Sequence, residues 1–121
     1  MMYEDGTGVP QDLTEALRLC QLAADQGYDG AQVSLGCNYQ NGTGVPQDHA
    51  EAVRLYQLAA DQGLAGAQSN LGGMYLEGSG VPLDLTQAAR LLKLAADQGF
   101  QPARVVLDHH TAAYPAGTRY P

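Results

Sequence analysis

Gly42-Thr43-Gly44-Val45-Pro46-Gln47-Asp48 is the stretch of this 121-residue chain that decides its fold, because it is one of three copies. The others are Gly6-Thr7-Gly8-Val9-Pro10-Gln11-Asp12 and Gly78-Ser79-Gly80-Val81-Pro82-Leu83-Asp84, so successive copies start 36 residues apart. A period of about 20 to 50 residues is typical of repeat proteins, whose units bury their apolar faces only by stacking on one another. The chain is therefore predicted to be a stacked array of one small unit.

Each copy is followed by the signals of a helix start and a helix end. Asp48 precedes Glu51 by three residues, which approaches the capping-box pattern, and Gly63 can end the helix in a left-handed conformation. Apolar residues at helical spacing lie between these signals, and a second helix with its own apolar face follows at once. The prediction is all-α, with successive antiparallel helix hairpins, no strand, and helices near 12–26, 29–41, 48–62, 65–77, 84–98 and 101–113.

The period also predicts how the chain is divided. We expect one solenoid domain over residues 1–113, made of units 6–41, 42–77 and 78–113 with part of a helix at 1–5, and a C-terminal tail at 114–121. Asp108 and Thr111 replace the glycine and tyrosine of earlier units, so the last helix is interpreted as a cap. The first long helix would lack its full partner, and its open face, represented by Leu13 and Leu17, would meet more solenoid or a neighbouring molecule.

Two further packing features follow from single residues. A glycine inside a helix costs about 1 kcal/mol relative to alanine, so Gly36 and Gly72 are expected where another helix backbone comes close. Cys20 and Cys37 are equally far from the turn between their helices and should lie at similar heights. A disulfide and two buried free thiols are both possible there, and the free thiols are favoured because helix pairs often exceed the Cα separation that a disulfide allows.

Composition limits the classes of partner. The chain has thirteen acidic and six basic residues and a formal net charge of −7, with 45% hydrophobic residues. Repulsion from phosphates argues against nucleic acid or an anionic membrane as the main ligand, so a neutral to basic partner is expected. No apolar run approaches the roughly 20 residues that a membrane helix needs.

The sequence offers no pattern for catalysis, a metal or a cofactor. The three histidines are His49, His109 and His110, and the adjacent pair would point in different directions on a helix. The glycine loops lack the lysine and strand context of a phosphate loop. Arginines 18, 54 and 90 are interpreted as solvated partners of residues 15, 51 and 87. Asp25, Asp61 and Asp97 would form an acidic row, which could receive a basic partner segment or, as we favour, be a solvated edge.

A family resemblance adds to this reading. The chain resembles the Sel-1-like repeats, relatives of the tetratricopeptide repeat, through Ala67-Gln68-Ser69-Asn70-Leu71-Gly72-Gly73-Met74-Tyr75, Gly78-Ser79-Gly80-Val81, Asp84, Ala88, Ala95-Ala96 and Gly99. The resemblance implies a right-handed α-solenoid that acts as an adaptor or scaffold, without chemistry of its own. The chain departs from the family pattern at Leu19-Cys20 and Leu91-Leu92, where an aromatic pair is common in the family.

The function expected from this resemblance is protein–protein interaction without catalytic activity, in a concave groove lined by the shorter helices. The groove positions implied are Val33, Ser34, Cys37, Gln40, Ser69, Asn70, Gly73, Leu76, Val105, Val106 and His109. Asn70 is the leading candidate, because its amide can bond both the donor and the acceptor of an extended peptide backbone. The alternative is a small-molecule-binding or hydrolytic protein, as in the cysteine-rich bacterial branch of the family. Self-association through the incomplete N-terminal face is a further possibility.

Overall fold

The structure is a computed structural model, and it describes residues 8–113, with side chains described from 13 to 108. The described part contains six α-helices and no strand: α1 Gly8–Asp25, α2 Asp29–Asn41, α3 His49–Asp61, α4 Ala65–Glu77, α5 Leu85–Asp97 and α6 Gln101–Ala113. Five of the six helices match their predicted spans to within one or two residues. The all-α prediction is thereby confirmed.

The predicted caps form in the second and third copies. Asp48 has extended backbone angles and accepts a 3.1 Å hydrogen bond from the Glu51 N–H, and Asp84 accepts one of 3.0 Å from the Gln87 N–H. Asn41 is followed by Gly42, whose φ of 72° closes α2 in the left-handed conformation. The repeated sequence signals therefore produce the same local cap at the start of α3 and at the start of α5.

In the first copy the prediction was wrong, because α1 begins at Gly8 and Asp12 lies inside the helix. The later loops are held by tertiary contacts. The Asp48 N–H bonds the Tyr39 carbonyl at 2.8 Å, and a Cβ on Gly44 would lie only 3.0 Å from a Leu13 methyl and nearer still to Leu17. The Gly80 backbone packs in the same way on the carbonyl of His49 at the start of α3. Among the described residues, no helix precedes Gly8-Val9-Pro10 on which a loop could pack in this way. These three residues extend α1 instead.

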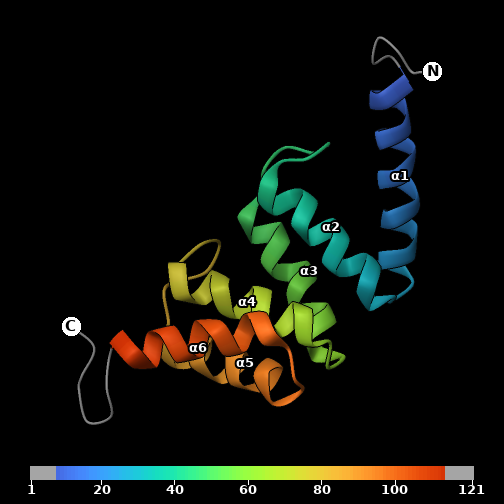
Figure 1. The fold of residues 1–121 in the computed structure, drawn as a ribbon. Coiled ribbons are helices and arrows are strands. Elements are labelled where there is room, and N and C mark those ends of the chain that lie inside the picture. The colour runs from blue at the N-terminus through green and yellow to red at the C-terminus, as the bar shows by residue number, and fades with distance from the viewer. Residues whose placement is uncertain (1–7, 114–121) are drawn as a thin grey trace.

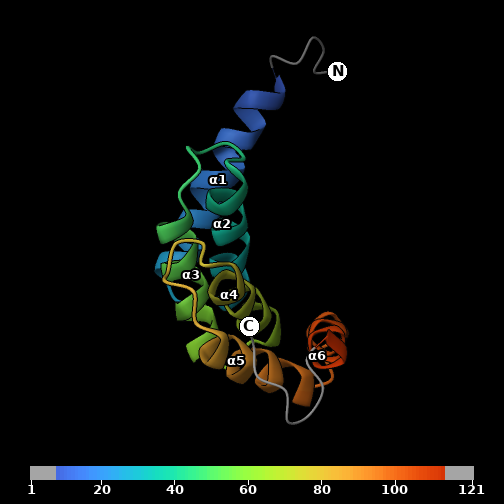
Figure 2. The same ribbon diagram turned by 90° about the vertical axis from the view of Figure 1, so that its left-hand side faces the viewer.

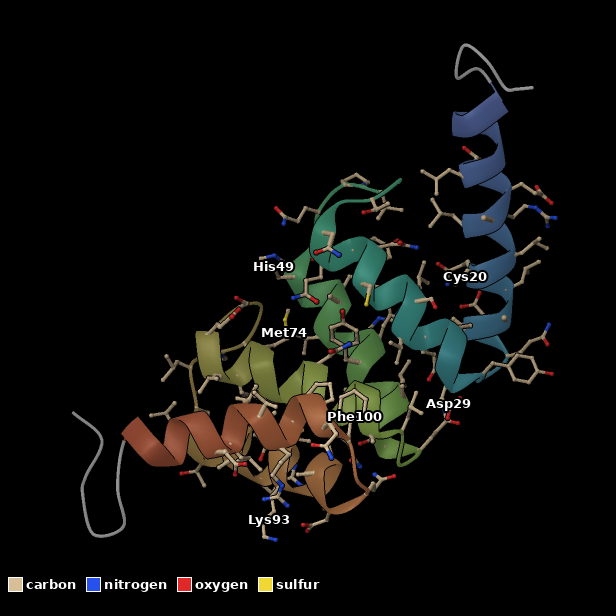
Figure 3. All side chains as sticks on the ribbon, in the orientation of Figure 1. Cys20, Asp29, His49, Met74, Lys93 and Phe100 are labelled. Carbon is tan, nitrogen blue, oxygen red and sulfur yellow. The ribbon has the colours of Figure 1, made fainter. Side chains whose placement is uncertain are left out.

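The helices stack in chain order, each packing on the one before and the one after (Figure 1). In the view of Figure 2, α4 lies to the right of α3 and α6 to the right of α5, so the even-numbered helices form one layer of a curved array. The core fills the space between the layers. Its fully buried side chains include Tyr56, Leu35, Leu55, Leu71 and Met74, and Met74 lies near the middle of the molecule in Figure 3.

Gly36 and Gly72 both mark close approaches of the next helix; the predicted backbone neighbour is present at Gly72, whereas the neighbour at Gly36 is a side chain. A Cβ on Gly36 would lie 2.7 Å from the ring of Tyr56 on α3, and one on Gly72 would lie 3.0 Å from Leu92 Cγ and 3.3 Å from the Ala88 carbonyl of α5. At Gly36 a side chain rather than a backbone needs the space. The glycine thus admits a large residue of the next helix, which is the packing role of a small residue opposite a large one.

Candidate interaction surfaces

The predicted groove residues of α2 are partly used by the fold itself. Tyr56 donates a 2.6 Å hydrogen bond to Oε1 of Gln40, and its hydroxyl oxygen lies 3.2 Å from Cys37 Sγ. Burial of the ring, with Cys37 as a further cause, raises the pKa of the Tyr56 hydroxyl. Val33 packs against the same core cluster, and only Ser34 is exposed. On α2, therefore, much of the predicted surface already contacts α3.

The predicted residues of α4 make no side-chain hydrogen bond to another described residue. Ser69, Asn70, Gly73 and Leu76 are all half-buried. A Cβ on Gly73 would meet no atom within 4 Å, so space is open there. Within the part of the chain whose side chains are described, the Asn70 amide makes no hydrogen bond. The Asn70 amide is thus half-buried without a hydrogen-bond partner among the described side chains.

On α6, Val105 is exposed and Val106 is half-buried against the cluster formed with α5. The side chain of His109 lies outside the described residues, as does that of His110. The groove residues of the three helices stay a prediction.

The two cysteines are free thiols, so of the two arrangements considered the disulfide does not form. They point to different neighbours. Cys20 Sγ lies 3.4 Å from the carbonyl oxygen of Ala31 at the start of α2, whereas Cys37 lies beside Tyr56 of α3. Both are half-buried rather than fully buried. Figure 3 labels Cys20 on α1, well separated from the α3 side of α2.

Charged residues on the odd-numbered helices pair within their own helices. Arg18 and Arg54 form ion pairs with Glu15 and Glu51, and Arg90 donates to Gln87 at 2.9 Å. The acidic row is also partnered: Gln21, Gln57 and Lys93 donate to Asp25, Asp61 and Asp97 at the i+4 positions. These contacts are exposed, so solvent and salt screen them and they contribute little to stability. No group of His, Cys, Asp or Glu in the described residues is arranged to hold a metal ion.

Sequence reasoning missed a set of glutamines that joins successive units. Gln32 and Gln68, at the starts of α2 and α4, are buried, with exposed fractions of only 3% and 7%. Gln62 donates to Oε1 of Gln32 at 3.0 Å, and Gln98 donates to Oε1 of Gln68 at 2.9 Å. The pair Gln32 and Gln62 recurs 36 residues later as Gln68 and Gln98. This repetition was the signal in the sequence that could have revealed the contact.

A cleft of about 650 Å³ lies between α1 and α3, on the outer side of one of these glutamine pairs. Its walls carry Asp25 from α1 and Arg54 from α3, and the exposed Leu58 lines it as well. The hydrogen bonds that Arg54 donates to Glu51 are the main cause that raises the pKa of the Arg54 guanidinium, and the charge of Asp25 across the cleft adds to it. The cleft therefore holds charges of both signs.

These features define a helical repeat protein whose described surface offers helix faces rather than a reactive centre. The Sel1 repeat family model matches residues 1–28, 30–64 and 65–100, and the chain belongs to the Sel1 repeat family. Proteins of this family are generally protein-interaction modules, and they are typically non-catalytic scaffolds. No curated protein matches the chain.

The solved structures that are similar to the chain include the following two. One is c5321, a protective antigen present in uropathogenic Escherichia coli strains and displaying an SLR fold, with 50% sequence identity and a TM-score of 0.71 over 72% of this chain. The other is a Sel1 repeat protein from Oxalobacter formigenes, with 40% identity and a TM-score of 0.72 over 74% of this chain. The match spans 19% of the first protein and 26% of the second, so both relatives are several times longer than the matched region.

Over residues 8–113, no helix combines the length and apolar character needed to cross a membrane.

Proposed function

We propose that this chain is a protein-interaction scaffold whose even-numbered helices receive an extended or helical peptide segment, and that it has no catalytic activity. The family supports the general role, and the single layer formed by α2, α4 and α6 supports the choice of surface (Figure 2). The central helix of that layer, α4, contributes four half-buried positions, Ser69, Asn70, Gly73 and Leu76.

The observation that carries this proposal is the Asn70 amide. It is half-buried and makes no hydrogen bond within the described side chains, so two donors and one acceptor are left to solvent. A polar group in that position loses part of its hydration without a protein partner, at a cost that a bound peptide backbone can remove. The half-buried Leu76, nearly two turns further along α4, adds an apolar contact on the same helix.

The charge of the chain indicates the character of the partner. With a formal net charge of −7, the protein attracts a segment that is apolar at its contacts and basic at its flanks. Such long-range attraction acts mainly on the association rate and is screened by salt. Binding should therefore weaken as salt is added.

The test uses the immobilised chain to capture a partner from an extract of the source cells. The double variant Asn70→Ala with Leu76→Asp should lose at least about tenfold in affinity for the captured protein, because a polar anchor and an apolar contact are both removed. The matched control is Gln57→Ala with Leu94→Asp, which changes the same residue classes on the odd-numbered helices. Equal losses in both variants, or full affinity in the first, would refute the proposed surface.

A further inference from the structure

The cleft between α1 and α3 presents hydrogen-bond acceptors that the fold leaves unused. Asp25 accepts a bond from Gln21 at Oδ1, and its second carboxylate oxygen has no partner among the described residues. Gln62 uses its amide nitrogen on Gln32, so its Oε1 stays free, and no described residue donates to the carbonyl of Gly27. Asp25, Gly27 and Gln62 all line the cleft, which therefore offers three acceptors to a ligand.

A buried side chain of the same cleft has an unused donor. Gln32 lines the cleft and is only 3% exposed. Its amide nitrogen donates to the carbonyl of Ala24 at 3.3 Å, so the second N–H of the amide has no partner among the described residues. A buried donor without a partner carries a free-energy cost that the carbonyl of a ligand can remove.

The charges around the cleft favour a cation. Arg54 lines the cleft, but its Nε and Nη2 donate to Glu51, so its charge is already paired. Asp25 is bonded to a neutral glutamine, which leaves the two carboxylates with one negative charge in excess of the guanidinium. The chain as a whole adds to this attraction, with a formal net charge of −7. The 40% exposed Leu58 lines the same cleft and offers apolar surface to an alkyl chain.

The next pair of odd-numbered helices provides an internal comparison. Between α3 and α5 the same residue types recur as Asp61, Gly63, Gln68, Arg90, Leu94 and Gln98. There, however, Gln98 donates to the Gly63 carbonyl at 3.0 Å, and Gln87 replaces the carboxylate of Glu51 as the partner of the arginine. The position inside the array thus has one acceptor fewer and no excess negative charge.

We propose that the cleft formed by α1, α2 and α3 binds a lysine of a partner protein. The ammonium group, which carries three donors, bonds to Asp25, Gly27 and Gln62, and its alkyl stem lies on Leu58. A backbone carbonyl of the same segment accepts the free N–H of Gln32. Separate acceptors suit an ammonium better than a guanidinium, whose donors lie in one plane. The volume of about 650 Å³ is typical of ligand sites and leaves room for the backbone beside the lysine.

The test is a titration of the isotope-labelled chain with Nα-acetyl-lysine N-methylamide up to about 20 mM, followed by amide chemical shifts. A ligand this small should bind with a dissociation constant in the millimolar range and shift Gly27, Leu58 and Gln62. The norleucine analogue, which has the same shape without the cation, should bind at least about tenfold more weakly. Butylammonium, which has the cation without the amides, should bind at least about threefold more weakly.

Two aspartate variants separate the cleft from general attraction to an acidic chain. Asp25→Asn should weaken lysine binding at least about fivefold, whereas Asp61→Asn, the matched change between α3 and α5, should leave it unaltered. Glu51→Gln, which copies Gln87, should weaken it about twofold because the excess charge is lost.

Four results would overturn the proposal: no shifts at the highest lysine concentration, equal binding of the norleucine analogue or of butylammonium, tighter binding of the arginine analogue, and equal losses in the two aspartate variants. The cleft contains no residue of α4, so this outcome is independent of the peptide-binding proposal, which is tested at Asn70 and Leu76.

Discussion

The side-chain amide of Gln62 donates a 3.0 Å hydrogen bond to Oε1 of Gln32, thirty residues earlier and one unit away. Gln32 in turn donates to the carbonyl of Ala24 at 3.3 Å, so one buried amide links α1, α2 and the end of α3. Gln98 repeats the arrangement with Gln68 and also donates to the Gly63 carbonyl at 3.0 Å. Successive units are thus joined by polar contacts as well as by apolar packing.

We expect Gln98→Ala to destabilise the protein by about 1–3 kcal/mol, because the buried acceptor of Gln68 and the Gly63 carbonyl lose their donor. The control is Gln26→Ala, at the equivalent position of the first unit, where the side chain is exposed and makes no hydrogen bond to a described residue. Urea denaturation should show a lower midpoint for the first variant and little change for the second. Similar midpoints in both variants would contradict the structural role of the pair.

The helix caps give a second comparison within one chain. Asp48→Ala removes the acceptor of the Glu51 N–H and should cost about 0.5–2 kcal/mol. Asp12→Ala should not show this loss, because Asp12 lies inside α1 and alanine is the better helix former. Denaturation midpoints of the two variants check the prediction. An equal loss in both would mean that α1 starts at Asp12 after all.

Gly36→Ala tests the close contact beneath Tyr56. The added methyl would lie 2.7 Å from the ring, so overpacking should destabilise the protein by about 1–3 kcal/mol despite the better helix propensity of alanine. Gly73→Ala is the control, since a Cβ there meets nothing within 4 Å and should stabilise α4 by up to about 1 kcal/mol. Thermal unfolding should move in opposite directions for the two variants. A shift of the same sign in both would be inconsistent with the contact.

Tyr56 predicts how stability depends on alkaline pH. Its pKa is raised by burial in the folded protein, while the unfolded chain has the ordinary value of about 10. Above about pH 10 the unfolded chain therefore loses a proton that the folded protein keeps, and stability falls as pH rises. Tyr56→Phe should remove this part of the alkaline loss, although it also loses the bond to Gln40. Urea midpoints of both proteins from pH 8 to 11 would check it, and parallel curves would contradict it.

The sequence was sufficient for features that one unit encodes by itself. The cap at Asp48, the left-handed Gly63 after α3 and the helix order all follow from local signals that recur every 36 residues. Features that depend on neighbouring units were harder to predict. Gly8-Val9-Pro10 carries the loop sequence yet lies in α1, because a loop of this type forms against an earlier helix.

The same limit explains the errors on side chains. Leu13 and Leu17 were expected on an open face, but they are half-buried where the Gly44 loop packs on α1, and Leu19 and Leu22 are the exposed leucines of that helix instead. The period was visible in the sequence, but the direction of each residue relative to the next unit was not. Gln32 and Gln62 were missed for that reason, since their contact joins residues thirty positions apart.

The central proposal is that the layer of even-numbered helices, and α4 above all, receives the partner. The most direct test is a titration of the isotope-labelled chain with its captured partner, followed by amide chemical shifts. We expect the largest shifts at Ser69, Asn70 and Leu76, with smaller ones along α2 and α6. Shifts confined to the cleft at Asp25, Arg54 and Leu58, or to the exposed Ala16 and Leu19 of α1, would contradict the proposal.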